Sequence, residues 1–193
     1  MTIGDSDALL VVDVQNDFCP GGALAVPGGD MVVPAINKLV GLFPTVVFSR
    51  DWHPTHHCSF SAEPTFEDMS WPMHCVQHSP GAEFHGDLIV PGDALQVRKG
   101  ADPDREAYSA FEGDLPLTAR LREREIERLF VAGLATDFCV KHSAIDGCRE
   151  GFEVLVVADA CRGIDEPAGT LDRAWEAMRA AGVRATRLGD VLE

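Results

Sequence analysis

The sequence predicts an α/β protein built on a parallel sheet with helices on both faces. Three observations predict it. Short apolar runs rich in β-branched residues recur along the 193 residues, as buried strands do. Segments with apolar residues on one helical stripe lie between several of these runs. Because strand and helix alternate, the connections are expected to cross over a parallel sheet and cover both of its faces.

Six apolar runs are short enough to be buried strands. The expected strands are residues 8–14, 45–49, 94–97, 129–134, 154–158 and 183–188. Four segments carry an apolar stripe of helical period. The expected helices are residues 30–43, 116–126, 138–150 and 167–181. Gly151 and Gly182 follow the last two helices directly, where glycine commonly ends a helix.

Residues 51–91 have no sustained period and are rich in His, Pro, Gly and Ser. A loop of this length inside a compact domain is usually functional or disordered. Because four aromatic residues follow its opening Asp51-Trp52-His53, we expect an ordered, functional loop.

Charge and composition exclude several classes of protein. The 31 acidic and 16 basic side chains give a net charge of −15, which opposes binding to nucleic acid or to an anionic membrane. No apolar run is long enough for a membrane span, and the start lacks the pattern of a signal peptide. The six cysteines show no C-x-x-C spacing, which suits a reducing compartment. We therefore expect one cytoplasmic domain over residues 1–193, without nucleic-acid or membrane partners; a homo-oligomer stays open.

Cys139 is the first candidate for catalysis, because it lies at the start of the helix expected after strand 129–134. The dipole and free N–H groups of a helix start favour an anion, so they would lower the pKa of a thiol and bind a developing oxyanion. Asp13 and Lys99 lie at the ends of two other expected strands. Since parallel strands end at one edge of a sheet, where ligands bind, we expect the three side chains to meet. The alternative is that Cys139 is a buried structural residue, Lys99 a solvated residue and Asp13 a surface or capping residue. Asp17 could cap a turn equally well.

Asp51 and His53 lie two residues apart just after another strand, and His57 and His74 follow in the loop. Two imidazoles and one carboxylate with open positions are typical of a catalytic metal site. A histidine-rich loop without metal remains the alternative.

Several segments, taken in order, resemble the nicotinamidases of the isochorismatase-like cysteine hydrolases. The segments that carry the resemblance are residues 13–22, 50–54, 71–75, 98–100, 108–111 and 133–140, the last reading GLATDFCV. The resemblance spans nearly the whole chain and implies a six-stranded parallel sheet in three layers. It also implies an amidohydrolase that converts nicotinamide and water to nicotinate and ammonia, accepts pyrazinamide, and serves NAD salvage and pyridine nucleotide biosynthesis.

The resemblance also implies roles for single residues. Asp13, Lys99 and Cys139 correspond to the catalytic triad, with a thioester on Cys139. The peptide Leu134-Ala135 matches a cis bond that directs the N–H of Ala135, together with that of Cys139, into an oxyanion hole. The implied substrate-binding residues are Phe18, Trp71, Tyr108, Leu134 and Ala135.

Asp51, His53 and His74 correspond to the ligands of one divalent metal ion, expected to be zinc, with iron and manganese as alternatives. His57 matches a fourth ligand in some relatives, whereas water completes the shell in others. The implied task of the ion is to bind the pyridine nitrogen of the substrate.

Two other functions stay open. A sister hydrolase of the same fold, acting on isochorismate, on an N-carbamoyl amine or on another small amide, would share the scaffold. Those relatives lack the metal loop, and isochorismatases generally lack the cysteine. A catalytically silent protein that keeps a metal and a pyridine pocket is the alternative from another class.

Overall fold

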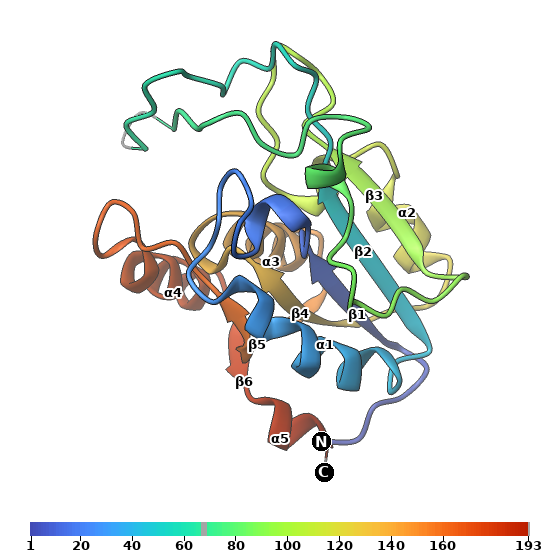
Figure 1. Ribbon diagram of the computed structural model, residues 1–193. Coiled ribbons are helices and arrows are strands. Elements are labelled where there is room, and N and C mark those ends of the chain that lie inside the picture. The colour runs from blue at the N-terminus through green and yellow to red at the C-terminus, as the bar shows by residue number, and fades with distance from the viewer. Residues whose placement is uncertain (67–68, 193) are drawn as a thin grey trace.

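A computed structural model of the chain describes residues 1–66 and 69–192. Its strands are β1 (Asp7–Val12), β2 (Thr45–Asp51), β3 (Leu95–Lys99), β4 (Arg128–Leu134), β5 (Glu153–Arg162) and β6 (Arg184–Thr186). They pair in parallel as one sheet in the order β3-β2-β1-β4-β5-β6 (Figure 1). The predicted six-stranded parallel sheet is confirmed.

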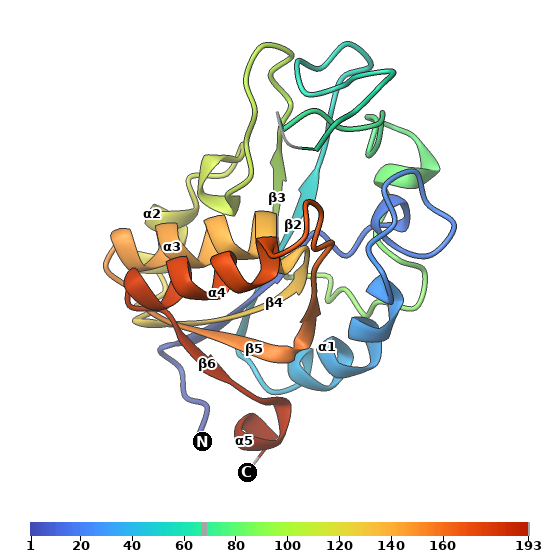
Figure 2. The ribbon, with the colours of Figure 1, turned by 90° about the vertical axis from the view of Figure 1, so that its left-hand side faces the viewer.

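Helices cover both faces of this sheet, as Figure 2 shows, with α1 on one side and α3 and α4 on the other. The helices are α1 (Val33–Val40), α2 (Leu117–Arg122), α3 (Lys141–Arg149), α4 (Thr170–Ala180) and α5 (Leu188–Leu192). Every residue of β1 is buried, which explains why residues 8–12 of this central strand are continuously apolar rather than alternating. The three-layer prediction is therefore also confirmed.

The ends of several elements differ from the prediction. The helix expected from residue 30 begins as a 3-10 turn, Gly29–Val32, and α1 ends at Val40, before the Phe43-Pro44 pair that disfavours helix. Helix α2 ends at Arg122 and Glu125 has a positive φ of 56°, so it is shorter than 116–126. Strand β6 covers only three residues, and residues 188–192 form α5, which sequence reasoning missed.

From β1 the chain adds β2 and β3 on one side of the sheet, and it then returns to add β4, β5 and β6 on the other side. The strand order therefore reverses between β1 and β4. In an open parallel sheet this is the point where ligands bind, beyond the carboxyl ends of the strands. The long loop after β2 lies at this end of the molecule in both views (Figures 1 and 2). It folds back on itself through bridges that join His53 to Val76 and Phe60 to Trp71.

No helix in the described parts of the chain has the length and apolar character needed to cross a bilayer.

Candidate active site

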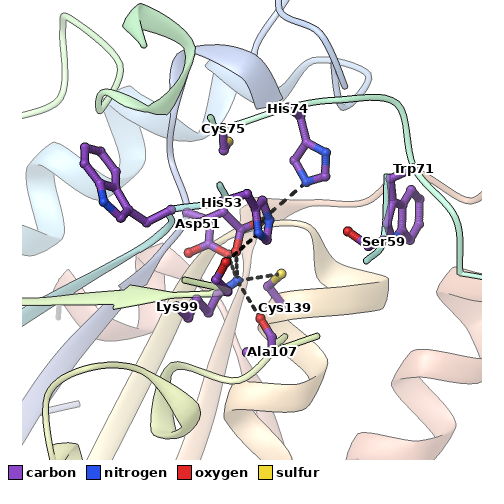
Figure 3. A network of polar contacts seen from close by, with 12 residues as sticks. Asp51, His53, Ser59, Trp71, His74, Cys75, Lys99, Ala107 and Cys139 are labelled. Atoms are coloured by element: carbon purple, nitrogen blue, oxygen red, sulfur yellow. Dashed lines mark hydrogen bonds and ion pairs between the residues drawn. The ribbon is translucent and has the colours of Figure 1, made fainter. Parts of the chain in front are cut away.

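Asp13, Lys99 and Cys139 meet at the point where the strand order reverses. Asp13 follows β1 directly, Lys99 ends β3, and Cys139 comes shortly after β4. Nζ of Lys99 lies 2.8 Å from Oδ2 of Asp13. It also lies 3.2 Å from Sγ of Cys139, a contact that is drawn in Figure 3. A carboxylate oxygen of Asp13 lies within 4.8 Å of that sulfur. The structure thus brings together the three side chains that the strand ends predicted.

The Lys99 ammonium is shared between two carboxylates. Besides Asp13 it contacts Oδ1 of Asp51, the last residue of β2, and both ion pairs are buried. Burial alone would lower the pKa of Lys99, but the two carboxylates outweigh it and raise that pKa well above its usual value. Lys99 is therefore a permanent buried cation at this site.

The thiol of Cys139 differs electrostatically from the prediction. Burial raises its pKa well above the usual value; the Lys99 ammonium opposes this, and the Asp13 carboxylate adds to it. The predicted lowering of this thiol pKa is therefore wrong, because burial outweighs the favourable charges. Burial also raises the pKa of Asp13, although Lys99 opposes that change. A thiol in such surroundings needs a neighbouring base to remove its proton.

Cys139 lies in a π-helical turn, Thr136–Val140, rather than in the first turn of an α-helix. The N–H groups of Phe138 and Val140 both donate to the Ala135 carbonyl at 3.1 Å. This wider turn delays the start of α3 to Lys141, and such turns are rare and frequent at functional sites. The Leu134-Ala135 peptide is cis.

Glycine is required in β4 next to this turn. Gly133 has a φ of 122°, and a Cβ there would lie 2.1 Å from the backbone oxygen of Val12. A side chain would therefore push β4 away from β1 and from Asp13, which itself has a positive φ of 49°. Left-handed backbone at a non-glycine residue is uncommon and often lies at active sites.

Asp51, His53 and His74 form a second cluster beside the first. Oδ2 of Asp51 lies 3.6 Å from Nε2 of His53 and 3.8 Å from Nε2 of His74. All three residues are buried, and each offers a ligand atom within 4.8 Å of the others. Burial would raise the pKa of Asp51, but Lys99, His53 and His74 together outweigh burial and hold that pKa well below its usual range. Asp51 is therefore an anion.

Backbone carbonyls orient both imidazoles of this cluster. Nδ1 of His53 donates to the Gly100 carbonyl at 2.9 Å, and Nδ1 of His74 donates to the Pro72 carbonyl at 2.7 Å. In its neutral form each imidazole then carries its lone pair on Nε2, the nitrogen that faces Asp51, which is how metal-binding histidines are commonly held. Gly100 has a φ of 66°, and a Cβ there would lie 2.3 Å from the His53 ring. The residues present therefore fit a divalent metal ion with N and O ligands.

His57 lies next to this cluster but is engaged elsewhere. Its ring centroid is 4.2 Å from that of His53. Its Nδ1 hydrogen-bonds with Oγ of Ser59 at 2.7 Å, and its Nε2 with the Arg105 carbonyl at 3.1 Å. Metal binding by His57 would require it to give up one of these bonds, and it stays a prediction.

A pocket opens onto both clusters. Its aromatic walls are Phe18, Trp71, Tyr108 and Phe138. Nε1 of Trp71 donates to the Tyr108 hydroxyl at 3.0 Å, and the Trp71 ring lies edge-on to Phe138 at 4.8 Å. Ala135 also lines the pocket. Leu134 is not one of the lining residues, because its side chain is fully buried in the core beside Gly29.

Sequence reasoning missed two residues that hold the acidic groups in place. Oγ of Ser49 donates to Oδ1 of Asp13 at 2.7 Å. The Gln15 amide bonds both backbone groups of Asp51, at 2.8 and 2.9 Å. The sequence signal that could have found Ser49 and Gln15 is the polar character of residues within or beside buried strands. Asp17 accepts the N–H of Cys75 at 2.7 Å, so it fixes the loop next to His74.

Asp137 is a third residue that was missed. Its carboxylate accepts the N–H groups of Ile164 and Asp165, at 3.1 and 2.8 Å, and the Thr170 hydroxyl at 2.7 Å. Asp137 thereby ties the segment after β5 to the turn that carries Cys139. Ile164, at the start of that segment, lines the pocket.

Comparison with known proteins assigns the family. The model of the isochorismatase domain matches residues 7–190 of this chain. The chain belongs to this family. Among its curated relatives, a nicotinamidase of Acinetobacter baylyi is 42% identical over 202 residues, covering 96% of this chain and 94% of the relative.

Two solved structures of the family extend the comparison. The pyrazinamidase of Pyrococcus horikoshii in complex with zinc is 41% identical, with a TM-score of 0.83, over 94% of this chain and 99% of the other. A protein from L. infantum, PnC1, in complex with nicotinate is 33% identical, with a TM-score of 0.90, over 99% of this chain and 98% of the other.

Proposed function

We propose that this isochorismatase-family chain is a nicotinamidase, an amidohydrolase that converts nicotinamide and water to nicotinate and ammonia. The observation that carries the proposal is the position of the buried Lys99 beside one aromatic pocket. Its ammonium contacts both the nucleophile cluster, Asp13 and Cys139, and Asp51 of the cluster with two histidines. The nicotinamidase relative at 42% identity and the nicotinate complex of a family member support it. Its product would feed NAD salvage, and its six free cysteines suit the cytoplasm.

In the proposed reaction Asp13 accepts the proton of the Cys139 thiol, and Sγ attacks the amide carbonyl to form a C–S bond. The N–H groups of Ala135 and Cys139 would bind the oxyanion, a contribution of about 3 kcal/mol for each donor. The C–N bond then breaks, and Asp13 returns its proton to the leaving ammonia. Asp13 then removes a proton from water, whose oxygen attacks the thioester carbonyl, and the C–S bond breaks. Asp13 returns this proton to Sγ, and the acid loses its own proton to solvent as nicotinate. Lys99 holds Asp13 in position throughout.

Asp51, His53 and His74 would hold one divalent metal ion, for which zinc is the proposed identity. The zinc complex of the pyrazinamidase relative and the carbonyl-oriented histidines support this assignment. When bound, the ion would supply an open coordination position for the pyridine nitrogen of the substrate. The aromatic walls would bind the faces of the ring and exclude water, so that the amide carbonyl is directed toward Cys139.

Replacement of His74 by alanine tests the metal site. We expect His74→Ala to bind the ion at least tenfold more weakly, because one of three ligands is lost, and to raise the KM for nicotinamide. The rate at which a small alkylating reagent modifies Cys139 should change much less. Elemental analysis of the purified protein measures the metal. His56→Ala, at an exposed histidine of the same loop, is the control, and undiminished metal in His74→Ala would contradict the assignment.

The choice of substrate tests the function itself. Nicotinamide and pyrazinamide should both release ammonia, whereas benzamide, which lacks the ring nitrogen, should react about a hundredfold more slowly because its carbonyl is misplaced. Ammonia release measured at equal concentrations of the three amides checks this. An isochorismatase or an N-carbamoyl amidase would ignore all three amides, and a silent binding protein would bind nicotinamide without turnover. Equal rates with nicotinamide and benzamide would contradict the positioning role of the metal.

A further inference from the structure

Glu106 places a carboxylate in the wall of the substrate pocket that none of the steps above uses. One carboxylate oxygen lies within 4.8 Å of ring nitrogens of His53 and His57. The other contact of this side chain is local, since Oε1 accepts the N–H of Ala107 at 3.0 Å. Its charge reaches the pocket, because after burial it is the largest influence that raises the pKa of Tyr108.

The carboxylate of Glu106 lacks, among the described residues, the lysine partner that the buried carboxylates of the site have. Among residues 1–66 and 69–192, no lysine or arginine forms an ion pair with it. By contrast, the buried Asp13 and Asp51 share the ammonium of Lys99. With a divalent ion bound, the positive charges of the ion and of Lys99 would exceed the negative charges of Asp13 and Asp51, so the site would carry a net positive charge. Glu106 supplies the negative charge that cancels this excess.

The proposed reaction makes this balance important, because it turns a neutral amide into a carboxylate of nearly the same shape. A positively charged pocket would hold the anionic product more tightly than the substrate. A carboxylate in the pocket wall repels that anion and leaves the neutral amide nearly unaffected. Discrimination between two ligands of equal shape then depends on this repulsive element.

We propose that Glu106 is a specificity-determining residue that makes the pocket favour neutral amides over carboxylates, and thereby speeds release of the acid product. The proposal rests on the nicotinamidase function and deepens it. Like charges that share a small pocket interact strongly in its low dielectric and are only partly screened by salt. We therefore expect Glu106 to weaken nicotinate binding about tenfold.

The substitution Glu106→Gln tests this, because it removes the charge and keeps the shape. Binding of nicotinate and nicotinamide is measured by calorimetry in the metal-loaded Cys139→Ala background, where no turnover occurs. We expect nicotinate to bind about tenfold more tightly after Glu106→Gln, while the dissociation constant for nicotinamide changes less than twofold. In the enzyme that retains Cys139, inhibition by nicotinate should strengthen by the same factor. Both effects should shrink in 1 M salt.

Asp104→Asn is the matched control, since it removes an equal charge from an exposed residue of the same segment, outside the pocket. It should leave nicotinate binding unchanged. Unchanged nicotinate affinity in Glu106→Gln would overturn the proposal, and so would equal tightening in Asp104→Asn, which would point to overall charge instead. Loss of metal from Glu106→Gln would assign Glu106 to ion binding and would also overturn it. Absence of ammonia release from nicotinamide by the unsubstituted protein would refute the nicotinamidase function separately, because the binding comparison needs no turnover.

Discussion

Cys139→Ala is expected to lower ammonia release from nicotinamide by about 10⁴-fold or more, which is the scale of losing a nucleophile. Sγ of Cys139 is the thiol that lies within reach of both Lys99 and the Asp13 carboxylate. The aromatic walls and the metal ligands are unchanged by this substitution, so the variant should still bind nicotinamide. A coupled ammonia assay measures the loss, and calorimetry measures the binding that remains.

The other cysteines are the internal controls for this result. Cys58 is the exposed one, whereas Cys19, Cys75 and Cys161 are buried and Cys148 is half-buried. Cys58→Ala should therefore keep the full rate. Mass spectrometry of a reaction quenched with acid should locate the acyl group on Cys139, and an adduct on any other cysteine would show that the nucleophile is misassigned.

Lys99→Met should abolish activity and also destabilise the fold. The substitution keeps the volume but leaves two buried carboxylates, Asp13 and Asp51, facing each other without their cation. Removing one partner of a buried ion pair costs about 3–5 kcal/mol, a large share of the stability of a typical domain. Because Asp13 would lose its orientation as well, turnover should fall below detection.

Urea unfolding followed by circular dichroism measures the stability of this variant. Lys38→Met, at an exposed lysine of α1, is the control and should change the free energy of unfolding by less than about 0.5 kcal/mol. A Lys99→Met protein as stable as the unsubstituted chain would show that the two carboxylates do not depend on this ammonium.

Much of the fold could be predicted because its signals are local. After a charged first residue, buried strands such as β1 and β4 are continuous apolar runs, and one of the expected helices is followed by Gly182. The elements that were predicted wrongly depend on tertiary contacts rather than on local sequence. The short β6 and the following α5 depend on packing at the edge of the sheet, and the π-helical turn depends on how the chain leaves β4.

The candidate site could be located because its residues lie at strand ends, which a parallel sheet brings to one edge. Asp13, Lys99 and Cys139 were found in this way, and the resemblance added the pocket walls. Glu106 and Ile164 could not be found, since they lie in irregular segments whose path is set by contacts such as those of Asp137. The pKa of Cys139 was mispredicted because the degree of burial is a property of the whole fold.

The shared ammonium of Lys99 makes the two clusters thermodynamically linked. Substitutions at Asp13 and Asp51 should not be additive, because each removes a partner of the same cation, and a double-mutant cycle between them should give a coupling energy of about 0.5–3 kcal/mol. Linkage is reciprocal, so any change that metal binding made to the contact between Asp51 and Lys99 would alter the affinity of the other cluster for a reversible ligand of Cys139. That ligand must then change the metal affinity by the same factor. Loss of activity in an Asp51 variant therefore reports on both clusters at once, whereas a His74 variant leaves the ammonium and its two carboxylates in place.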